Sequence, residues 1–163
     1  MRRTLFTITV LLLTAGILDA RAGFPLEDQF LKKHTWQSLF SGKTLIIIGG
    51  DQRKTAEYSK AWKAQLDPVL GQRARIVGLA NLDGVPFFVS NNSIRESLRE
   101  SVPALPVLCD WDGKAFAALG MTPDTITVLV FGKNGTLTGR VTGLVSANGV
   151  AREIGRASCR ERV

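Results

Sequence analysis

The sequence predicts an α/β fold with a mixed central β-sheet flanked by helices. Short runs rich in β-branched residues alternate with amphipathic segments along most of the chain, a pattern typical of parallel strands joined by right-handed helical crossovers. Asn134-Gly135 then lies between two further β-rich runs, and Asn-Gly is the strongest short signal for a tight antiparallel hairpin. We therefore expect parallel strands extended by an antiparallel pair in one sheet.

Periodicity and turn residues locate the individual elements. Continuous β-branched and Leu runs predict strands buried on both faces, and apolar residues at spacings of three and four predict helices. Pro68 and Gly71 are expected to end the first long helix, and Asn92 or Ser93 to cap the next. The expected strands cover residues 43–49, 74–80, 106–109, 125–131 and 136–141; the expected helices cover 54–67, 94–102 and 114–120, with a partly helical lead-in over 23–40 and a last helix from Ser146.

Both ends of the chain are expected to lie outside the domain. Residues 1–22 combine a basic start, an apolar run and a small-x-small ending, the order typical of a signal peptide removed after export rather than of a buried helix. The apolar run is shorter than the ~20 residues of a membrane-spanning helix, which argues against a stable membrane anchor. Residues 154–163 resemble an in-frame translation of a sequencing adapter, so we interpret them as an artefact rather than a basic tail. Residues 23–153 then form one domain with a truncated last helix.

Charge and cysteine content limit the possible functions. The formal charge of the chain is +7, but residues 1–22 and 154–163 each carry a net +2, which leaves +3 for the 131 residues between them. This mild charge gives no support to nucleic-acid binding. With Cys159 set aside in the tail, Cys109 is the single cysteine of the expected domain, so an intramolecular disulfide is not expected there.

Three consecutive stretches resemble a known family. Residues 107–113 (VLCDWDG) are a strand running into an acidic turn, a short Ala-rich helix follows, and residues 128–135 (VLVFGKNG) lead into the final strand. This series resembles the second half of redoxin and thioredoxin-like proteins, and is most similar to the exported YtfJ-like branch. The resemblance covers residues 24–153 in element order. It implies a thioredoxin-like fold and a location in the bacterial periplasm.

The chain departs from this family where the family carries its chemistry. A Cys-x-x-Cys motif would open the helix after the first buried strand, where the helix N-terminus lowers the thiol pKa. That position holds Asp51-Gln52-Arg53-Lys54, without sulfur, and the attacking cysteine of a peroxiredoxin is missing there too. The family's cis-proline corresponds to Ile126, with Pro123 a few positions early. Dithiol oxidoreductase and peroxiredoxin chemistry are therefore unsupported.

Cys109 has two interpretations. It could be a redox-active single thiol, or a buried structural cysteine, since free cysteine is among the most buried residue types. The neighbouring carboxylates of Asp110 and Asp112 would raise the pKa of the thiol, which favours the structural interpretation. Asp110, Asp112 and Gly113 also imitate the start of a calcium loop, but the position that needs a Glu holds Met121, so a turn is favoured.

Asp51, Arg53, Lys54 and Glu57 are the candidate binding residues. They lie where parallel α/β sheets bind ligands, although a solvated helix start with an Asp cap is the favoured explanation. His34, the one histidine, has no second ligand for a metal, and no cofactor or metal is expected. The main hypothesis is a non-catalytic exported binding module for an unidentified protein or small molecule. The alternative is a single-thiol redox enzyme using Cys109.

Overall fold

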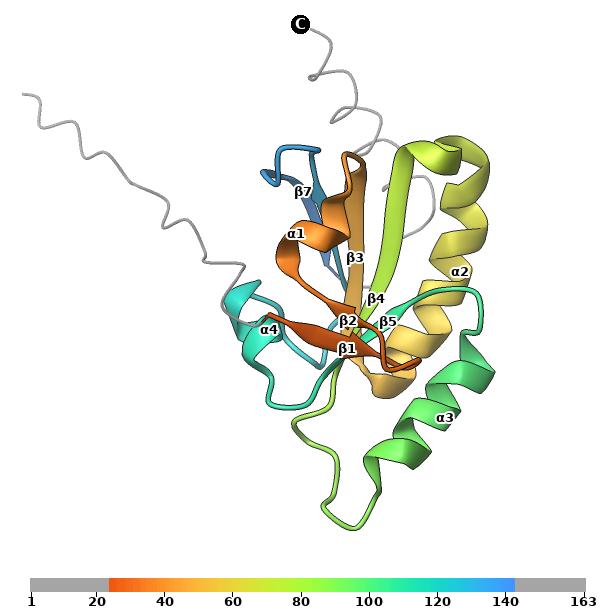
Figure 1. The fold of residues 1–163 in the computed structure, drawn as a ribbon, viewed down its shortest axis with the longest axis vertical. Helices are drawn as coiled ribbons and strands as arrows, with labels where there is room; N and C mark the ends of the chain where they lie inside the picture. Colours follow the sequence, from red (N-terminus) through yellow and green to blue (C-terminus); the bar gives the residue numbers. More distant parts are fainter. Residues whose placement is uncertain (1–23, 143–163) are drawn as a thin grey trace, which may run out of the picture.

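A computed structural model describes residues 24–142 of the protein, except for the side chains of Gln52 and Val69. The predicted signal peptide, the predicted last helix from Ser146 and the predicted artefact at 154–163 lie outside the described residues. Figure 1 shows the described part as a central sheet with helices packed against it.

The described residues form one seven-stranded mixed sheet in the order β2-β1-β5-β4-β3-β6-β7. The two central crossovers are as predicted: β3, β4 and β5 run parallel to one another and are joined by helices. The first two strands and the last two add antiparallel neighbours at the two sides of this parallel unit. The strands are β1 Leu26–Asp28, β2 Lys33–His34, β3 Thr44–Asp51, β4 Ala74–Asn81, β5 Val107–Asp110, β6 Thr127–Phe131 and β7 Leu137–Thr142.

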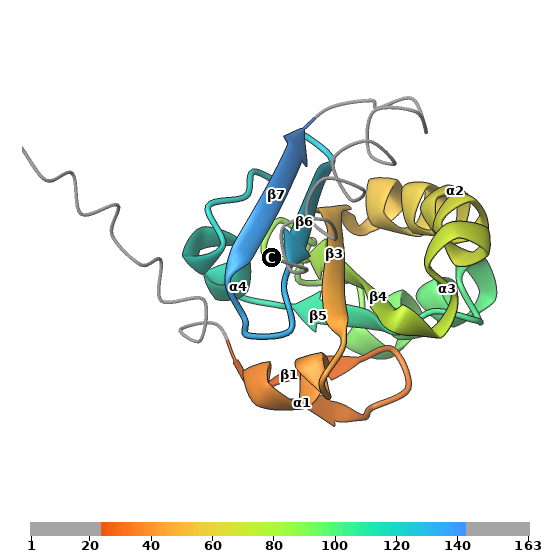
Figure 2. The ribbon, with the colours of Figure 1, turned by 90° about the horizontal axis from the view of Figure 1, so that it is seen from above.

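Helices cover both faces of the sheet. Helices α2 (Gln52–Leu70) and α3 (Asn91–Ser101) lie together on one face, whereas α1 (Trp36–Phe40) and α4 (Lys114–Ala118) pack against the other (Figure 2). Alternate residues of β3 enter the two cores, because successive side chains of a strand point to opposite faces. Ile46 and Ile48 pack with α2, while the two residues Leu45 and Ile47 pack with α1 and α4.

The five predicted strands and the three predicted helices are all present, with shifted ends. Helix α2 begins at Gln52, capped by Asp51, and continues through Pro68 to Leu70. The prediction that Pro68 ends this helix was wrong: proline in the last turn removes only one backbone donor, and the chain turns at Gly71, whose φ is +51°. Ser90, rather than Asn92 or Ser93, caps α3 by accepting a hydrogen bond from the Ser93 amide at 3.1 Å.

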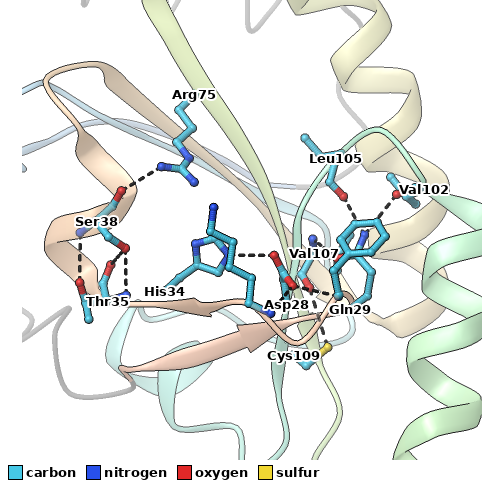
Figure 3. Close-up of polar contacts among 12 residues, drawn as sticks. Asp28, Gln29, His34, Thr35, Ser38, Arg75, Val102, Leu105, Val107 and Cys109 are labelled. Atoms are coloured by element: carbon cyan, nitrogen blue, oxygen red, sulfur yellow. Dashed lines mark hydrogen bonds and ion pairs between the residues drawn. The ribbon is translucent and has the colours of Figure 1, made fainter.

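The lead-in segment holds a β-hairpin that the sequence did not predict. Strands β1 and β2 pair ahead of α1, and β1 also pairs with β5, so that Glu27 lies opposite Cys109. Asp28 closes the turn: its Oδ1 accepts hydrogen bonds from the amides of Phe30 and Lys32, and its Oδ2 lies 2.8 Å from His34 Nε2 (Figure 3). His34 is therefore a buried partner of Asp28.

Gln29 attaches this hairpin to the rest of the domain. Its side chain is fully buried, with 0% exposure. The amide Nε2 donates to the carbonyl oxygens of Val102 and Leu105 at 3.2 and 2.9 Å, and Oε1 accepts from the amide of Val107 at 2.7 Å (Figure 3). One side chain thus satisfies three backbone groups in the segment that connects α3 to β5.

Candidate functional site

Polar residues end all three parallel strands at the same edge of the sheet. Asp51 on β3 is the register partner of Asn81 on β4, and Asn81 is the partner of Asp110 on β5. This carboxyl edge is where open α/β sheets bind ligands, because the loops that follow the strands leave space there. Asp51 was a predicted site residue, whereas Asn81 was missed because a single Asn after a strand is indistinguishable from a turn residue.

Asp51 and Lys54 bind each other and the backbone around them. Asp51 Oδ1 accepts a hydrogen bond from the Lys54 amide at 2.8 Å, as a helix cap, and Oδ2 lies 3.3 Å from Lys54 Nζ. Lys54 Nζ also donates to the Asp124 carbonyl oxygen at 2.8 Å, and the Asp51 amide donates to the Pro123 carbonyl oxygen at 3.1 Å. The start of α2 is thereby tied to the loop that precedes β6.

Arg53 projects into open space beside this ion pair. It lines a hollow of about 560 Å³, here called the edge hollow, and it has no hydrogen-bond or ion-pair partner among the described residues. The edge hollow is lined by Asp51, Arg53, Asn81, Asp83, Gly84, Val85 and Pro123.

The four predicted binding residues do not form one site. Asp51 and Arg53 both line the edge hollow. Glu57 lines a second hollow of about 420 Å³ between α2 and α3, and Arg53 also belongs to the lining of this second hollow. Lys54 lines neither hollow, since its ammonium group is held by Asp51 and the Asp124 carbonyl. Arg53 is the residue common to both hollows.

Cys109 faces α3 and is almost completely buried, with 1% of its surface exposed. Burial raises the pKa of its thiol from 9.0 to about 11; Asp28 and Glu27 act in the same direction, and the positive charge of Arg95 opposes them. The sequence correctly predicted that the pKa of the thiol is raised, but it assigned the wrong cause. Burial and the carboxylates of Asp28 and Glu27 on β1 raise this pKa, rather than the carboxylates of Asp110 and Asp112. At neutral pH the group is a protonated thiol.

The acidic turn after β5 organises α4. Asp110, with 0% exposure, accepts a hydrogen bond from the Phe116 amide at 2.9 Å through Oδ2, while its Oδ1 has no partner. Burial raises the pKa of Asp110, whereas the exposed Asp112 has its pKa lowered, chiefly by its hydrogen bond with Lys114. Within residues 24–142, no three His, Cys, Asp or Glu side chains are arranged to hold a metal ion.

A larger hollow of about 640 Å³ lies between β1, the start of α3 and the acidic turn, and Cys109 is among its lining residues; we call it the Arg95 groove. Of its residues, only Cys109 was a candidate site residue in the sequence. Ile94 and Leu98 mark the apolar face of α3, but the spacing of residues in α3 did not single out Arg95. The Arg95 groove is lined by Phe24, Pro25, Leu26, Glu27, Lys33, Asn91, Arg95, Cys109, Trp111, Asp112 and Lys114.

Solved structures with the same arrangement of elements identify the fold. A secreted Mycobacterium tuberculosis disulfide oxidoreductase homologous to E. coli DsbE superposes with a TM-score of 0.62 at 14% identity, covering 85% of this chain and 98% of that chain. The exposed lipoprotein thioredoxin Etrx1 of Streptococcus pneumoniae gives a TM-score of 0.64 at 16% identity, covering 82% and 98%. The chain has a thioredoxin-like fold. The predicted fold class is thus confirmed.

The comparisons with solved structures show the fold of the chain but not its function. The bacterioferritin comigratory protein of Xanthomonas campestris, whose structure was studied for alkyl peroxide reduction, is also similar, with a TM-score of 0.63 at 15% identity, covering 85% of this chain and 94% of that one. No model of a protein family matches the chain, and no curated protein matches it. At such identities the likeness shows a shared fold, and the function has to be argued from the site.

The thioredoxin-like fold gives the edge residues a clear position. Asp51 and Lys54 lie at the first turn of the helix after the first parallel strand. This is the position at which the resemblance to thioredoxin-like proteins would place a Cys-x-x-Cys motif. Ile126 is buried in the core, whereas the Pro123 carbonyl binds the Asp51 amide. Pro123 and Asp124 thus both bind the edge through their carbonyl oxygens, and Pro123 lines the edge hollow.

Proposed function

We propose that this thioredoxin-fold protein is an exported binding protein that holds an anionic ligand in the edge hollow. The observation that carries the proposal is the guanidinium of Arg53, which has no partner among the described residues and lines the same hollow as Asn81, at the carboxyl edge of the parallel strands. A guanidinium presents a planar fork of donors that matches carboxylate and phosphate oxygens. The ligand is therefore a small molecule or a protein segment that bears such a group.

Export rests on two supports. Residues 1–22 have the order of a signal peptide, and the structural neighbours include a secreted oxidoreductase and an exposed lipoprotein. None of the helices in the described part of the chain has the length and hydrophobicity needed to cross a bilayer. We propose a periplasmic location and membership of the YtfJ-like branch on the sequence pattern alone.

Binding in the edge hollow is tested by isothermal titration with phosphate, citrate and a triglutamate peptide. We expect saturable binding of at least one of these anions, weakened at least tenfold by Arg53→Ala. Lys133→Ala is the control, because Lys133 is an exposed cation in the turn between β6 and β7. Equal binding by the Arg53→Ala variant and the unmodified protein would refute the proposal.

The second candidate is a single-thiol redox enzyme using Cys109. The names of the structural neighbours, among them a disulfide oxidoreductase and a peroxide-reducing protein, favour this candidate over a binding module. Cys109 also lines the Arg95 groove, and the charge of Arg95 acts to lower the pKa of its thiol. The burial of the thiol and its pKa of about 11 weigh in the other direction.

Labelling of the native protein with a thiol reagent at neutral pH separates the two candidates. A buried, protonated Cys109 reacts only after denaturation, which is the result we expect. Labelling faster than that of free cysteine, together with reduction of a peroxide or disulfide that Cys109→Ser abolishes, would establish the redox enzyme instead. Cys109→Ser also serves as the control for reaction at the other cysteine of the chain, Cys159.

A further inference from the structure

The Arg95 groove combines an apolar wall with a buried cation. Phe24, Pro25 and Leu26 on one side and Trp111 on the other supply the apolar surface. Its volume of about 640 Å³ lies within the range of pockets that hold small organic molecules, ~300–1,000 Å³. The rest of the lining is polar or charged, so the groove offers a ligand both an apolar wall and polar partners.

Arg95 is the polar group at the centre of this groove. Only 9% of the residue is exposed, and its guanidinium carbon lies 5.1 Å from the centroid of the Trp111 ring. Nη2 donates to Glu27 Oε2 at 2.9 Å, whereas Nε is buried and has no hydrogen-bond partner within residues 24–142. A guanidinium carries five N–H donors, so most of this binding capacity is unused. A buried donor without a partner is costly and calls for an acceptor.

The charges around the groove favour an anion. Glu27 is already paired with Arg95, and Asp112 is paired with Lys114. Lys33 adds an exposed cation at the rim, so the five charged groups of the lining sum to one positive charge. One carboxylate would neutralise this charge and accept hydrogen bonds from the guanidinium of Arg95.

We propose that the Arg95 groove binds a hydrophobic monocarboxylate, whose carboxylate pairs with Arg95 and whose aryl or alkyl body lies against Trp111 and Phe24. This site is separate from the edge hollow and does not depend on Arg53. Glu27 and the ligand compete for the same guanidinium, because both present a carboxylate to it. Glu27 therefore limits the affinity of the groove.

The competition gives the proposal a test in which two variants change affinity in opposite directions. The probe is 4-phenylbutyrate, followed by its effect on the backbone amide signals of Cys109 and Trp111 in NMR titrations. We expect saturable shifts at both positions, and binding of the uncharged 4-phenylbutyramide at least tenfold weaker. Glu27→Gln keeps the shape of the side chain and removes the competing charge, so it should tighten binding about fivefold. Arg95→Gln should weaken it at least tenfold.

Two comparisons make the outcome decisive. Arg53→Ala should leave binding of 4-phenylbutyrate unchanged, which separates this site from the edge hollow. If Arg95→Gln fails to fold, the Glu27→Gln result still decides the proposal, since Glu27 has a partly exposed side chain. The proposal is overturned if the shifts do not saturate, if the amide binds as well as the acid, or if Glu27→Gln leaves the affinity unchanged or lower.

Discussion

Replacement of Gln29 by Leu should remove the attachment of the β1–β2 hairpin. The side chain makes hydrogen bonds to Val102, Leu105 and Val107, at 3.2, 2.9 and 2.7 Å. Leu fills a similar volume but leaves two carbonyl oxygens and one N–H group buried without this partner. Each unpaired group costs about 1–3 kcal/mol. Partial relaxation and the apolar gain from Leu offset some of this, so we expect the free energy of unfolding to fall by about 3–5 kcal/mol.

Urea denaturation followed by circular dichroism measures this loss. The matched control is Gln65→Leu, at an exposed position of α2, which should change the free energy of unfolding by less than about 0.5 kcal/mol. The Gln29→Leu variant should also label faster at Cys109, because β1 pairs with β5 at that residue. A loss below about 1 kcal/mol would show that the hydrogen bonds of Gln29 do not hold the hairpin, and would refute this reasoning.

Three further changes test the buried groups around the sheet. The folded protein holds the Cys109 proton more tightly than the unfolded chain, because the pKa of the thiol rises from 9.0 to about 11. The free energy of unfolding should therefore fall by about 2 kcal/mol more between pH 9 and 11 than it does in Cys109→Ala, as urea denaturation would show. Burial raises the pKa of Asp110, so ionisation of this carboxyl group opposes folding. Asp110→Asn keeps an acceptor for the Phe116 amide, and its stability relative to the unmodified protein should rise from pH 4 to pH 7 in the same assay. Gly78→Ala would place a methyl group 3.0 Å from Val107 Cγ2 and 3.2 Å from Ser59 Oγ, and should lower the free energy of unfolding by about 1–3 kcal/mol in thermal denaturation.

Each of these changes has its own control. Gly84→Ala is the control for Gly78→Ala, because a methyl group added at Gly84 would have no atom within 4 Å. Parallel pH curves for Cys109→Ala and the unmodified protein would contradict the first expectation. The expectation for Asp110 would be contradicted if the stability of Asp110→Asn, relative to the unmodified protein, were lower at pH 7 than at pH 4. Equal melting of the Gly78→Ala and Gly84→Ala variants would show that α2 can move away from β4.

The central sheet could be predicted because its strands contain continuous apolar runs. Residues 45–48 and 76–80 are such runs, and they indicate strands buried on both faces. The β1–β2 hairpin carries no such signal, since its strands have three and two residues. Its position depends on the pairing of Glu27 with Cys109, far along the chain, which local patterns do not encode.

The candidate site was only partly predictable for a related reason. Asp51 and Arg53 follow a recognisable buried strand, so their place at the sheet edge could be inferred. Glu57 lies one helical turn further along α2 and therefore enters a different hollow. The burial of Arg95 arises only when β1 and the segment after β5 close around α3, so no spacing within α3 could reveal it.

The ion pair between Asp51 and Lys54 joins residues with the spacing of a Cys-x-x-Cys motif. A disulfide at that place would open and close with the redox state of its surroundings. An exposed ion pair does not respond to a reductant, and its weak attraction falls as ionic strength rises. The edge of this sheet should therefore keep the same structure in oxidising and reducing buffers, and salt, rather than thiols, is the variable that loosens the start of α2.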